Sequence, residues 1–311
     1  MKPLRLKIDF EIPKCELQQK WPSFYTIGSC FAENQSSRLT RLGFSLNSNP
    51  FGIIYNPVSI EKILCRIVDD DKYTSHDFKS VDGYFSLEHH GSFKYEMLDA
   101  AINESNSILT KTKERLKQTD ICVITLGTSL VYQYDHKIVA NCHRLPTQDF
   151  KQIQLTYQEI FNSLNSIIKY CKSLNNNIQL VFTVSPIRHL KSGIVKNQRS
   201  KALLISTIHD VIESLNHSNT TYFPAYEIFI DELRDYRFCE EDLSHPNKQA
   251  QDYIWERFCE TYFSENTKII ISSVEKYTNY KNHRPIKLEP YQEKLDQMKK
   301  QLIKTYPFLH L

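Results

Sequence analysis

Glycine is scarce in this chain of 311 residues, which contains only seven, and we find no internal repeat and no low-complexity segment. The eight cysteines are scattered without Cys-x-x-Cys spacing, which argues against a disulfide framework and predicts reduced thiols. Residues 1–14 alternate charged and apolar side chains, so we expect no signal peptide. No run approaches the roughly 18 apolar residues of a membrane span. These absences predict a cytoplasmic protein without a membrane span.

An excess of one charge is also lacking. The 39 Lys and Arg residues nearly balance the 36 Asp and Glu residues, and the two signs are interspersed along the chain. We therefore expect no nucleic-acid partner. Apolar residues make up 41% of the chain, enough to bury a sizeable core in one large domain or two ordinary ones. The oligomeric state is open.

Short apolar runs alternate with amphipathic stretches along the chain. The runs predict strands at 24–28, 44–48, 121–127, 178–185 and 220–225. The amphipathic stretches predict helices at 31–42, 57–69, 96–118, 154–174, 197–217 and 246–263, the last with Pro246 in its first turn. This alternation predicts a parallel sheet covered on both faces by helices.

Two inserts interrupt this rhythm, and a tail follows it. Residues 70–95 form the first insert, and residues 131–150 read as a hairpin that turns at 135–137. Residues 265–311 are rich in Lys and are expected to be helical. We expect one domain at 1–264, with residues 265–311 as a helical extension packed on or beside it.

The predicted strand ends collect polar and reactive side chains. Gly28, Gly52 and Gly127 end or follow predicted strands, which favours tight loops or close approach to a ligand. Ligands of open parallel sheets bind outside the carboxyl ends of the strands. The residues expected at this edge are Ser29, Cys30, Asn49, Pro50, Phe51, Thr128, Ser129, Ser185, Pro186, Arg188 and His189, with Asp242 and His245 from a later loop.

Asp242 and His245 are spaced so that their side chains can meet. Residues three apart in a tight turn face each other, so the carboxylate can fix the tautomer and orientation of the imidazole. The other ring nitrogen is then free to take a proton from a nucleophile. The alternative is that Asp242 caps the last predicted helix and His245 is a surface residue.

Ser29 and Cys30 both offer a nucleophile at the predicted strand-to-helix turn. A thiolate beside a protonated His and a helix N-terminus has a pKa well below the free value of about 8.5, so we expect a low pKa for Cys30. The alternative is that Cys30 is a packing thiol and Ser29 is a helix N-cap.

A set of motifs resembles the GSCFA family, which is similar to the SGNH (GDSL-like) hydrolases. The motifs are "TIGSCFAEN", "NPFGIIYNP", "ITLGTS", "NCHRLP", "SPIRHLKSGIVKNQRSKA", "YFPAYEI…DELRDYRF" and "DLSHPN", and the resemblance runs from about residue 7 to the tail. It implies a flavodoxin-like three-layer α/β/α fold with about five parallel strands, and a triad in the order nucleophile, Asp242, His245. It implies no cofactor and no metal.

Position by position, the resemblance favours sulfur as the nucleophile. The first block of SGNH hydrolases reads Gly-Asp-Ser, and Gly28-Ser29-Cys30 stands in its place, so Cys30 takes the nucleophile position. The same resemblance implies oxyanion donors at the backbone N–H groups of Cys30 and Gly52 and at a side chain after Gly127. SGNH enzymes use an Asn there. In this chain the expected groups are Thr128 and Ser129, with Asn56 as the compensating amide.

Other polar residues are expected around the pocket. His90 and His143 of the two inserts are predicted to line it, whereas the alternatives are ordinary loop histidines or a zinc site of His89, His90, Cys142 and His143. Arg188 suits a substrate carboxylate or phosphate, and His189 is expected beside it.

The sequence as a whole predicts an SGNH-like enzyme that hydrolyses or transfers an O-acyl ester. The expected partner is a small-molecule or glycan acyl ester, such as a carbohydrate or cell-envelope precursor. In this hypothesis His245 deprotonates Cys30 and Asp242 orients His245. The rival hypothesis is a non-catalytic carbohydrate- or metabolite-binding module on a degenerate SGNH fold.

Overall fold

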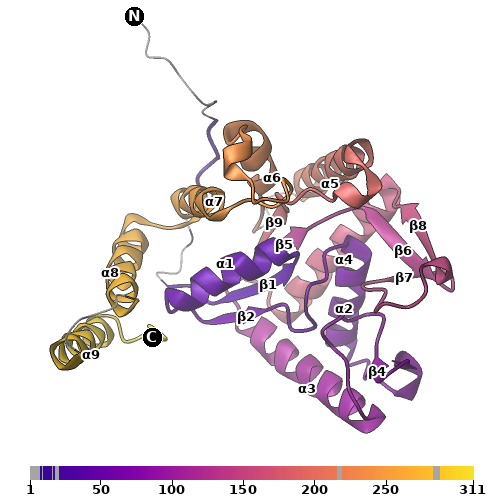
Figure 1. Ribbon diagram of the computed structural model, residues 1–311, viewed down its shortest axis with the longest axis horizontal. Coiled ribbons are helices and arrows are strands. Elements are labelled where there is room, and N and C mark those ends of the chain that lie inside the picture. Colours follow the sequence, from indigo (N-terminus) through magenta and orange to yellow (C-terminus); the bar gives the residue numbers. More distant parts are fainter. Residues whose placement is uncertain (1–7, 9, 16, 18–20, 216–218, 283–287) are drawn as a thin grey trace, which may run out of the picture.

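A five-stranded parallel sheet forms the centre of the molecule in the computed structural model (Figure 1), which describes all residues except 1–7, 9, 16, 18–20, 216–218 and 283–287. The strand order is β10-β9-β5-β1-β2. The strands are β1 (Phe24–Gly28), β2 (Leu46–Ser48), β5 (Ile121–Leu126), β9 (Gln179–Val184) and β10 (Thr220–Phe223). All five lie within the predicted ranges, so the predicted parallel sheet is confirmed.

Helices cover both faces of this sheet, as predicted. One face packs against α2 (Pro57–Asp69), α3 (Leu98–Lys117), α4 (Tyr157–Leu174) and α5 (Ile194–Ser214). The other face packs against α1 (Cys30–Arg41) and α7 (Lys248–Tyr262). Neighbouring side chains of one strand enter opposite cores, with Phe24 in the second and Tyr25 in the first, because side chains alternate along a strand. The three-layer α/β/α architecture is confirmed.

Five of the six predicted helices start at a different residue, and only α2 starts where predicted; α1 starts one residue early, α3 two late and α4 three late. Helix α5 begins at Ile194, three residues early, and the predicted end at 216–217 lies outside the described residues. Helix α7 begins at Lys248, because the side chain of Asn247 accepts the backbone N–H of Ala250 at 3.1 Å. Pro246 therefore precedes the helix rather than starting it.

The inserts add two small antiparallel sheets. The first contains β3 (Lys79–Ser80) and β4 (Tyr84–Phe85), and the second has the order β7-β6-β8. Strands β6 (Leu130–Tyr134) and β7 (Lys137–Val139) form the predicted hairpin, with Asp135 and His136 at positive φ in its turn. The third strand, β8 (Phe150–Gln154), was not predicted, and neither was the short helix α6 (Ala225–Glu227).

The tail is helical, as expected. Helices α8 (Glu265–Lys281) and α9 (Leu288–Thr305) project to one side of the sheet (Figure 1). The chain end then returns to the turn between α1 and β2, where the backbone N–H of His310 donates to the Gly43 carbonyl at 3.1 Å. Trp21 stacks on Phe44 at 3.8 Å between ring centroids and contacts Phe308 at 5.6 Å. No helix among the described residues is long and apolar enough to cross a membrane.

Gly28 ends β1 at a position that only glycine fits. Its φ is +145°, and a Cβ added there would lie 2.2 Å from the Thr125 carbonyl oxygen on β5. Both atoms belong to paired backbones, so neither can move aside without opening the sheet. The close approach of β1 and β5 at this point brings the residue after Gly28 to the sheet edge.

We expect Gly28→Ala to lower the free energy of unfolding by at least about 3 kcal/mol, since it adds a steric clash to an unfavourable φ. Gly193→Ala is the matched control, because Gly193 also has positive φ but nothing lies within 4 Å of its added Cβ. We expect that control to cost about 1 kcal/mol. Urea denaturation measures both values, and equal losses would contradict the role given to the clash.

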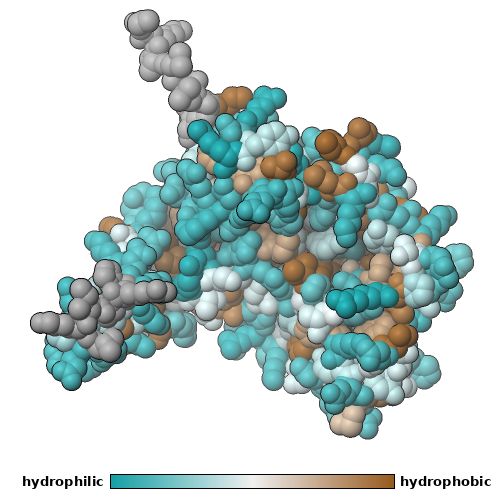
Figure 2. Space-filling view, viewed as in Figure 1, coloured by the Kyte–Doolittle hydropathy of each residue, from teal (hydrophilic) through white to brown (hydrophobic). Residues whose placement is uncertain are grey.

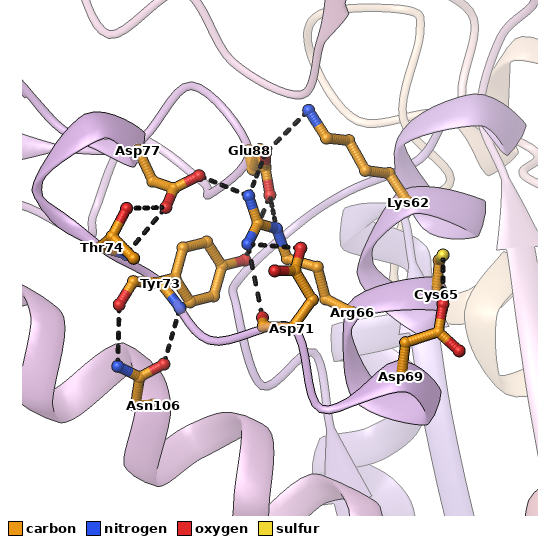
Figure 3. A network of polar contacts seen from close by, with 10 residues as sticks. All are labelled: Lys62, Cys65, Arg66, Asp69, Asp71, Tyr73, Thr74, Asp77, Glu88 and Asn106. Carbon is orange, nitrogen blue, oxygen red and sulfur yellow. Dashed lines mark hydrogen bonds and ion pairs between the residues drawn. The ribbon is translucent and has the colours of Figure 1, made fainter.

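Arg66 on α2 contacts several residues of the insert of residues 70–95 and links it to the central domain (Figure 3). Its side chain is buried, its Nε donates to Glu88 at 2.8 Å, and its other nitrogens pair with Asp71 and Asp77. The guanidinium also lies over the Tyr73 ring, 4.4 Å from its centroid. The charges are therefore paired within a partly buried network, and the network sets where the insert lies.

We expect Arg66→Met to destabilise the protein by about 3–5 kcal/mol, because it leaves Glu88 and Asp77 without their buried partner. Lys62→Met is the control, since Lys62 is a half-exposed partner of the same Glu88 and should cost less than about 1 kcal/mol. Urea denaturation, with proteolysis mapped within residues 70–95, tests this. Equal stability of the two variants would show that Arg66 does not hold the insert.

Candidate active site

Backbone hydrogen bonds bring the ends of β1, β2 and β5 together. The N–H of Ser29 donates to the Thr125 carbonyl at 3.1 Å, which holds the turn after β1 against β5. The N–H of Gly28 donates to Asn49 Oδ1 at 2.8 Å, which joins the loop after β2. The N–H of Gly127 donates to the Tyr55 carbonyl at 2.7 Å. Ser29, Asn49 and Tyr55 therefore lie close to the ends of β1 and β5.

Of the two candidate nucleophile residues, Cys30 is the more exposed. Ser29 is 2% exposed, and its Oγ is buried without a hydrogen-bond partner among the described residues. Ser29 occupies the N-cap position of α1, yet its side chain caps no N–H group. Cys30 is the first residue of α1 and is partly exposed. The geometry therefore agrees with the choice of Cys30.

The expectation of a low thiol pKa is wrong for the structure as it stands. Burial raises the pKa of Cys30 above its ordinary value, and the Glu33 charge acts in the same direction. The backbone N–H groups of Cys30 and Phe31 and the charge of Lys201 lower the pKa, but they do not outweigh burial. Cys30 is therefore a thiol near neutral pH in this structure.

The predicted contact between Asp242 and His245 is present. Asp242 Oδ2 lies 2.5 Å from His245 Nδ1, and Oδ1 accepts the backbone N–H groups of Ser244 and His245 at 2.9 and 3.0 Å. The N–H groups of His245 and Ser244 hold the pKa of the Asp242 carboxyl well below its usual range. Helix α7 is capped by Asn247 instead, so the helix-cap alternative for Asp242 is wrong.

The loop after β9 is hydrogen-bonded to the turn that contains Asp242 and His245. The backbone N–H of Arg188 donates to the Ser244 carbonyl at 3.1 Å, and its guanidinium donates to the Leu243 carbonyl. The guanidinium also faces the Tyr236 ring. In this structure Arg188 braces the turn, and its predicted contact with a substrate anion stays a prediction.

His189 lies in the same electrostatic neighbourhood as His245. Burial lowers its pKa to about 4, and the charges of Lys201 and His245 add to this effect, so the ring is neutral near pH 7. The ring stacks on Tyr55, 5.5 Å between centroids, and its Nε2 is buried without a partner among the described residues. His189 therefore offers a neutral nitrogen at the predicted edge.

The side chains expected to complete an oxyanion hole are all engaged elsewhere. Ser129 Oγ donates to the Ser200 carbonyl at 3.2 Å, and Thr128 Oγ1 lies 2.8 Å from Ser200 Oγ. Asn56 caps α2 by accepting the Ser59 N–H at 2.8 Å. The Gly52 N–H donates to the Asn49 carbonyl at 2.7 Å. A role for any of them in binding an oxyanion stays a prediction and requires an existing hydrogen bond to be exchanged.

The histidines of the inserts are mostly held by aromatic contacts. His89 is fully buried with its ring 4.7 Å from Phe51, and burial lowers its pKa to about 3. His143 Nε2 lies 2.9 Å from the His89 carbonyl, and its ring stacks on Phe85. His90 packs on Gly52 so closely that an added Cβ would lie 2.3 Å away. The first insert therefore reaches the loop after β2.

The zinc alternative finds no support in the part of the chain that the structure describes. No group of three or more His, Cys, Asp or Glu residues there is placed to hold a metal ion. Cys142 is a half-buried free thiol, and burial raises its pKa.

Comparison with known proteins decides the family. The GSCFA family model matches residues 23–258, which is most of the chain. The chain belongs to the GSCFA family. No curated protein matches it in sequence.

Two solved carbohydrate esterases are similar to this GSCFA chain at a low level. A Clostridium thermocellum family 3 carbohydrate esterase covers 81% of this chain and 98% of its own length, with a TM-score of 0.35 and 8% identity. A carbohydrate esterase family 3 protein from Talaromyces cellulolyticus covers 54% of this chain and 65% of its own, with a TM-score of 0.29 and 8% identity. At these values neither superposition carries an argument about activity.

Two further buried polar residues near the strand ends of this GSCFA chain were not singled out by the sequence analysis. Asn49 was placed only at the sheet edge, but its Oδ1 is fixed by Gly28, while its buried Nδ2 has no partner among the described residues. It is thus a fixed amide donor beside the end of β1. Lys201 is 1% exposed on the sheet-facing side of α5. A lysine four residues after buried Asn197 and three before buried Leu204 was the available signal.

Proposed function

We propose that the protein hydrolyses or transfers an O-acyl ester, with Cys30 as nucleophile and His245 as the acid–base group. The observation that carries this proposal is the Asp242–His245 pair, with one ring nitrogen fixed by the carboxylate at 2.5 Å. Its turn is hydrogen-bonded to the loop after β9, at the edge where partly exposed Cys30 begins α1. A nucleophile, a base and a group that orients the base are the parts that acyl transfer requires.

The proposed reaction has two steps. The Cys30 thiolate attacks the ester carbonyl carbon, the C–O bond breaks, and protonated His245 gives its proton to the leaving alkoxide. Water or an acceptor hydroxyl then loses its proton to His245 and attacks the thioester, and the thiolate leaves. Asn49 Nδ2 and the backbone N–H of Cys30 are the donors that we assign to the developing oxyanion. A thioester passes its acyl group readily to hydroxyls, so transfer belongs to the proposal beside hydrolysis.

Exposed apolar side chains near the site fit the acyl part of a substrate. Ile194 and Val195 at the start of α5 are 65% and 73% exposed, and Leu243 in the turn of Asp242 is 50% exposed. Figure 2 shows brown, apolar surface over the region that Figure 1 labels α5. We assign these three side chains to the acyl-binding surface. For the alcohol part, we propose acylated carbohydrates or cell-envelope precursors as the first class to test.

Two observations favour the alternative function, a non-catalytic binding module. The pKa of Cys30 is raised, and the expected oxyanion groups Gly52, Ser129 and Asn56 are engaged in internal hydrogen bonds. A binding module retains the fold and a ligand site without turnover.

A screen of acyl sugars and p-nitrophenyl esters, with an acyl-phosphonate labelling arm, separates the two functions. We expect turnover of at least one ester class and rapid labelling confined to Cys30. Binding of an acyl sugar without turnover and without a uniquely fast residue would establish the binding module instead.

A further inference from the structure

A cavity beside the loop after β9 is lined by two arginines. Its volume is about 190 Å³, well above the about 10–15 Å³ that a cavity needs to hold one water. The polar and reactive residues of its lining are Arg188, Arg234, Asp235, Tyr236 and Cys239. The proposed mechanism uses none of these residues, so the cavity is a candidate for a binding site of its own.

Backbone contacts attach this cavity to the turn that holds the proposed base, His245. The backbone N–H of Arg188 donates to the carbonyl of Ser244 at 3.1 Å. Another lining residue, Cys239, pairs with Pro246 in an isolated antiparallel bridge. Ser244 and Pro246 are the two chain neighbours of His245. The cavity is therefore held beside the proposed base from both sides of that residue.

The guanidinium of Arg188 keeps its charge unpaired at this cavity. Its Nη2 donates to the Leu243 carbonyl and lies 3.8 Å from Cys239 Sγ, and neither acceptor is a carboxylate. Its Nε is buried without a partner among the described residues. A guanidinium has five N–H donors and stays charged in proteins. Arg188 therefore braces the turn with one nitrogen and retains both a positive charge and unused donors.

The second arginine adds charge of the same sign. Arg234 is exposed and lines the same cavity. The acidic residue of the lining, Asp235, is instead engaged by Arg237, which lies outside the lining. Asp235 Oδ1 accepts the backbone N–H of Arg237 at 2.9 Å, and Oδ2 lies 3.9 Å from Arg237 Nε. The cavity therefore carries an excess of positive charge, and a cleft of this kind attracts anions.

We propose that this cavity binds an oxyanion group, a phosphate or a carboxylate, through Arg188 and Arg234. Arginine presents a planar fork of donors that matches the geometry of both groups. The Tyr236 ring is 66% exposed, and its centroid lies 5.7 Å from the guanidinium carbon of Arg188. It supplies an apolar wall for the part of the ligand that carries the anion. Applied to the substrate, the inference rests on the proposed function: the favoured ester carries a phosphate or carboxylate group.

Modification of arginines by phenylglyoxal, read by peptide mass spectrometry, tests the site on the native protein without a substrate. Inorganic phosphate and acetate are the two probes. We expect at least one of them to slow the modification of Arg188 and Arg234. Arg115 is the control, because it is an exposed arginine of α3 and the cavity lies against the core on the other face of the sheet. Neither probe should change its modification.

The affinity for the protecting anion, measured by isothermal titration calorimetry, should fall at least about tenfold in Arg234→Gln, because the variant removes a charge-assisted hydrogen bond. Arg115→Gln should keep the native affinity. Arg234 is exposed, so this variant should fold normally, whereas Arg188→Gln also removes the brace on the turn. The site is overturned if neither probe protects the two lining arginines, if Arg115 is protected equally, or if Arg234→Gln binds the anion as tightly as the native protein.

The substrate arm compares kcat/KM for an O-acetyl sugar phosphate with that for the matching O-acetyl methyl glycoside. We expect the phosphate to be favoured at least about tenfold, and we expect Arg234→Gln to lose this preference while Arg115→Gln keeps it. Equal kcat/KM values with protection would overturn the assignment of the anion to the substrate. Protection without turnover of any ester would leave the anion site standing, and the proposed function would fail. Turnover without protection would overturn the anion site and leave the proposed function standing.

Discussion

Cys30→Ala should lower ester turnover by at least about 10³-fold, while Ser29→Ala should retain it within about tenfold. Cys30 begins α1 and is a partly exposed residue, whereas the Ser29 hydroxyl is buried and contacts no partner among the described residues. A hydroxyl that solvent cannot reach is not positioned to attack an ester. Steady-state kinetics with the ester found in the screen measures both effects.

Cys65→Ala is the matched control for loss of a thiol. Cys65 is also a partly exposed helical cysteine, but it lies on α2 and bonds Asp69 away from the edge, so this variant should keep native turnover. Cys30→Ser should be much weaker than the native enzyme, because a serine hydroxyl is far less acidic than a thiol. An inactive Ser29→Ala beside an active Cys30→Ala would show that oxygen attacks and that the alignment with the SGNH pattern is shifted by one residue.

Asp242→Asn should lower turnover by about 10²–10⁴-fold and leave the melting temperature unchanged. The carboxylate accepts from His245 Nδ1 and thereby leaves the other nitrogen to exchange protons. An amide at this position can hold the ring in the wrong tautomer. Asp242 is exposed, so its loss should not disturb the core. Kinetics and thermal melting of the same preparation separate the two effects.

Glu241→Gln tests whether any loss of charge in this turn has the same effect. Glu241 is the exposed neighbour of Asp242, and we expect native turnover for this variant. The pKa of Asp242 is lowered in the folded protein, so its carboxylate is ionised, and can orient His245, at neutral and mildly acidic pH. Native turnover by Asp242→Asn would show that Asp242 only stabilises the turn and does not take part in catalysis.

The sheet was predictable because each of its strands can be recognised from its own residues. The run Ile121–Leu126 is apolar on both faces, and Gly127 follows it, so both type and end are visible in the sequence. Strand β8 was missed because Phe150–Gln154 is mostly polar and is a strand only through its pairing with β6. The early start of α5 was missed for a related reason. Ile194 and Val195 are exposed, so they do not continue the apolar periodicity.

Only those contacts of the candidate site that lie within one turn of the chain were predictable. Asp242 and His245 are three residues apart, so their contact follows from the geometry of one turn. Asn49 and Lys201 contact backbone groups far along the chain, the Gly28 N–H and the Ser185 carbonyl, and no spacing rule connects such positions. The pKa of Cys30 was predicted in the wrong direction, because a helix N-terminus is visible in the sequence and the depth of burial is not.

The most direct test of Cys30 as the nucleophile is to trap the acyl-enzyme. Protein mixed with p-nitrophenyl acetate is quenched in acid during turnover, digested, and sequenced by tandem mass spectrometry across Gly28–Phe31. We expect the acetyl group on Cys30, removable by neutral hydroxylamine as a thioester is, and absent from Cys30→Ala. An acetyl group on Ser29 that resists hydroxylamine, or turnover with no acetylated residue in this peptide, would contradict it.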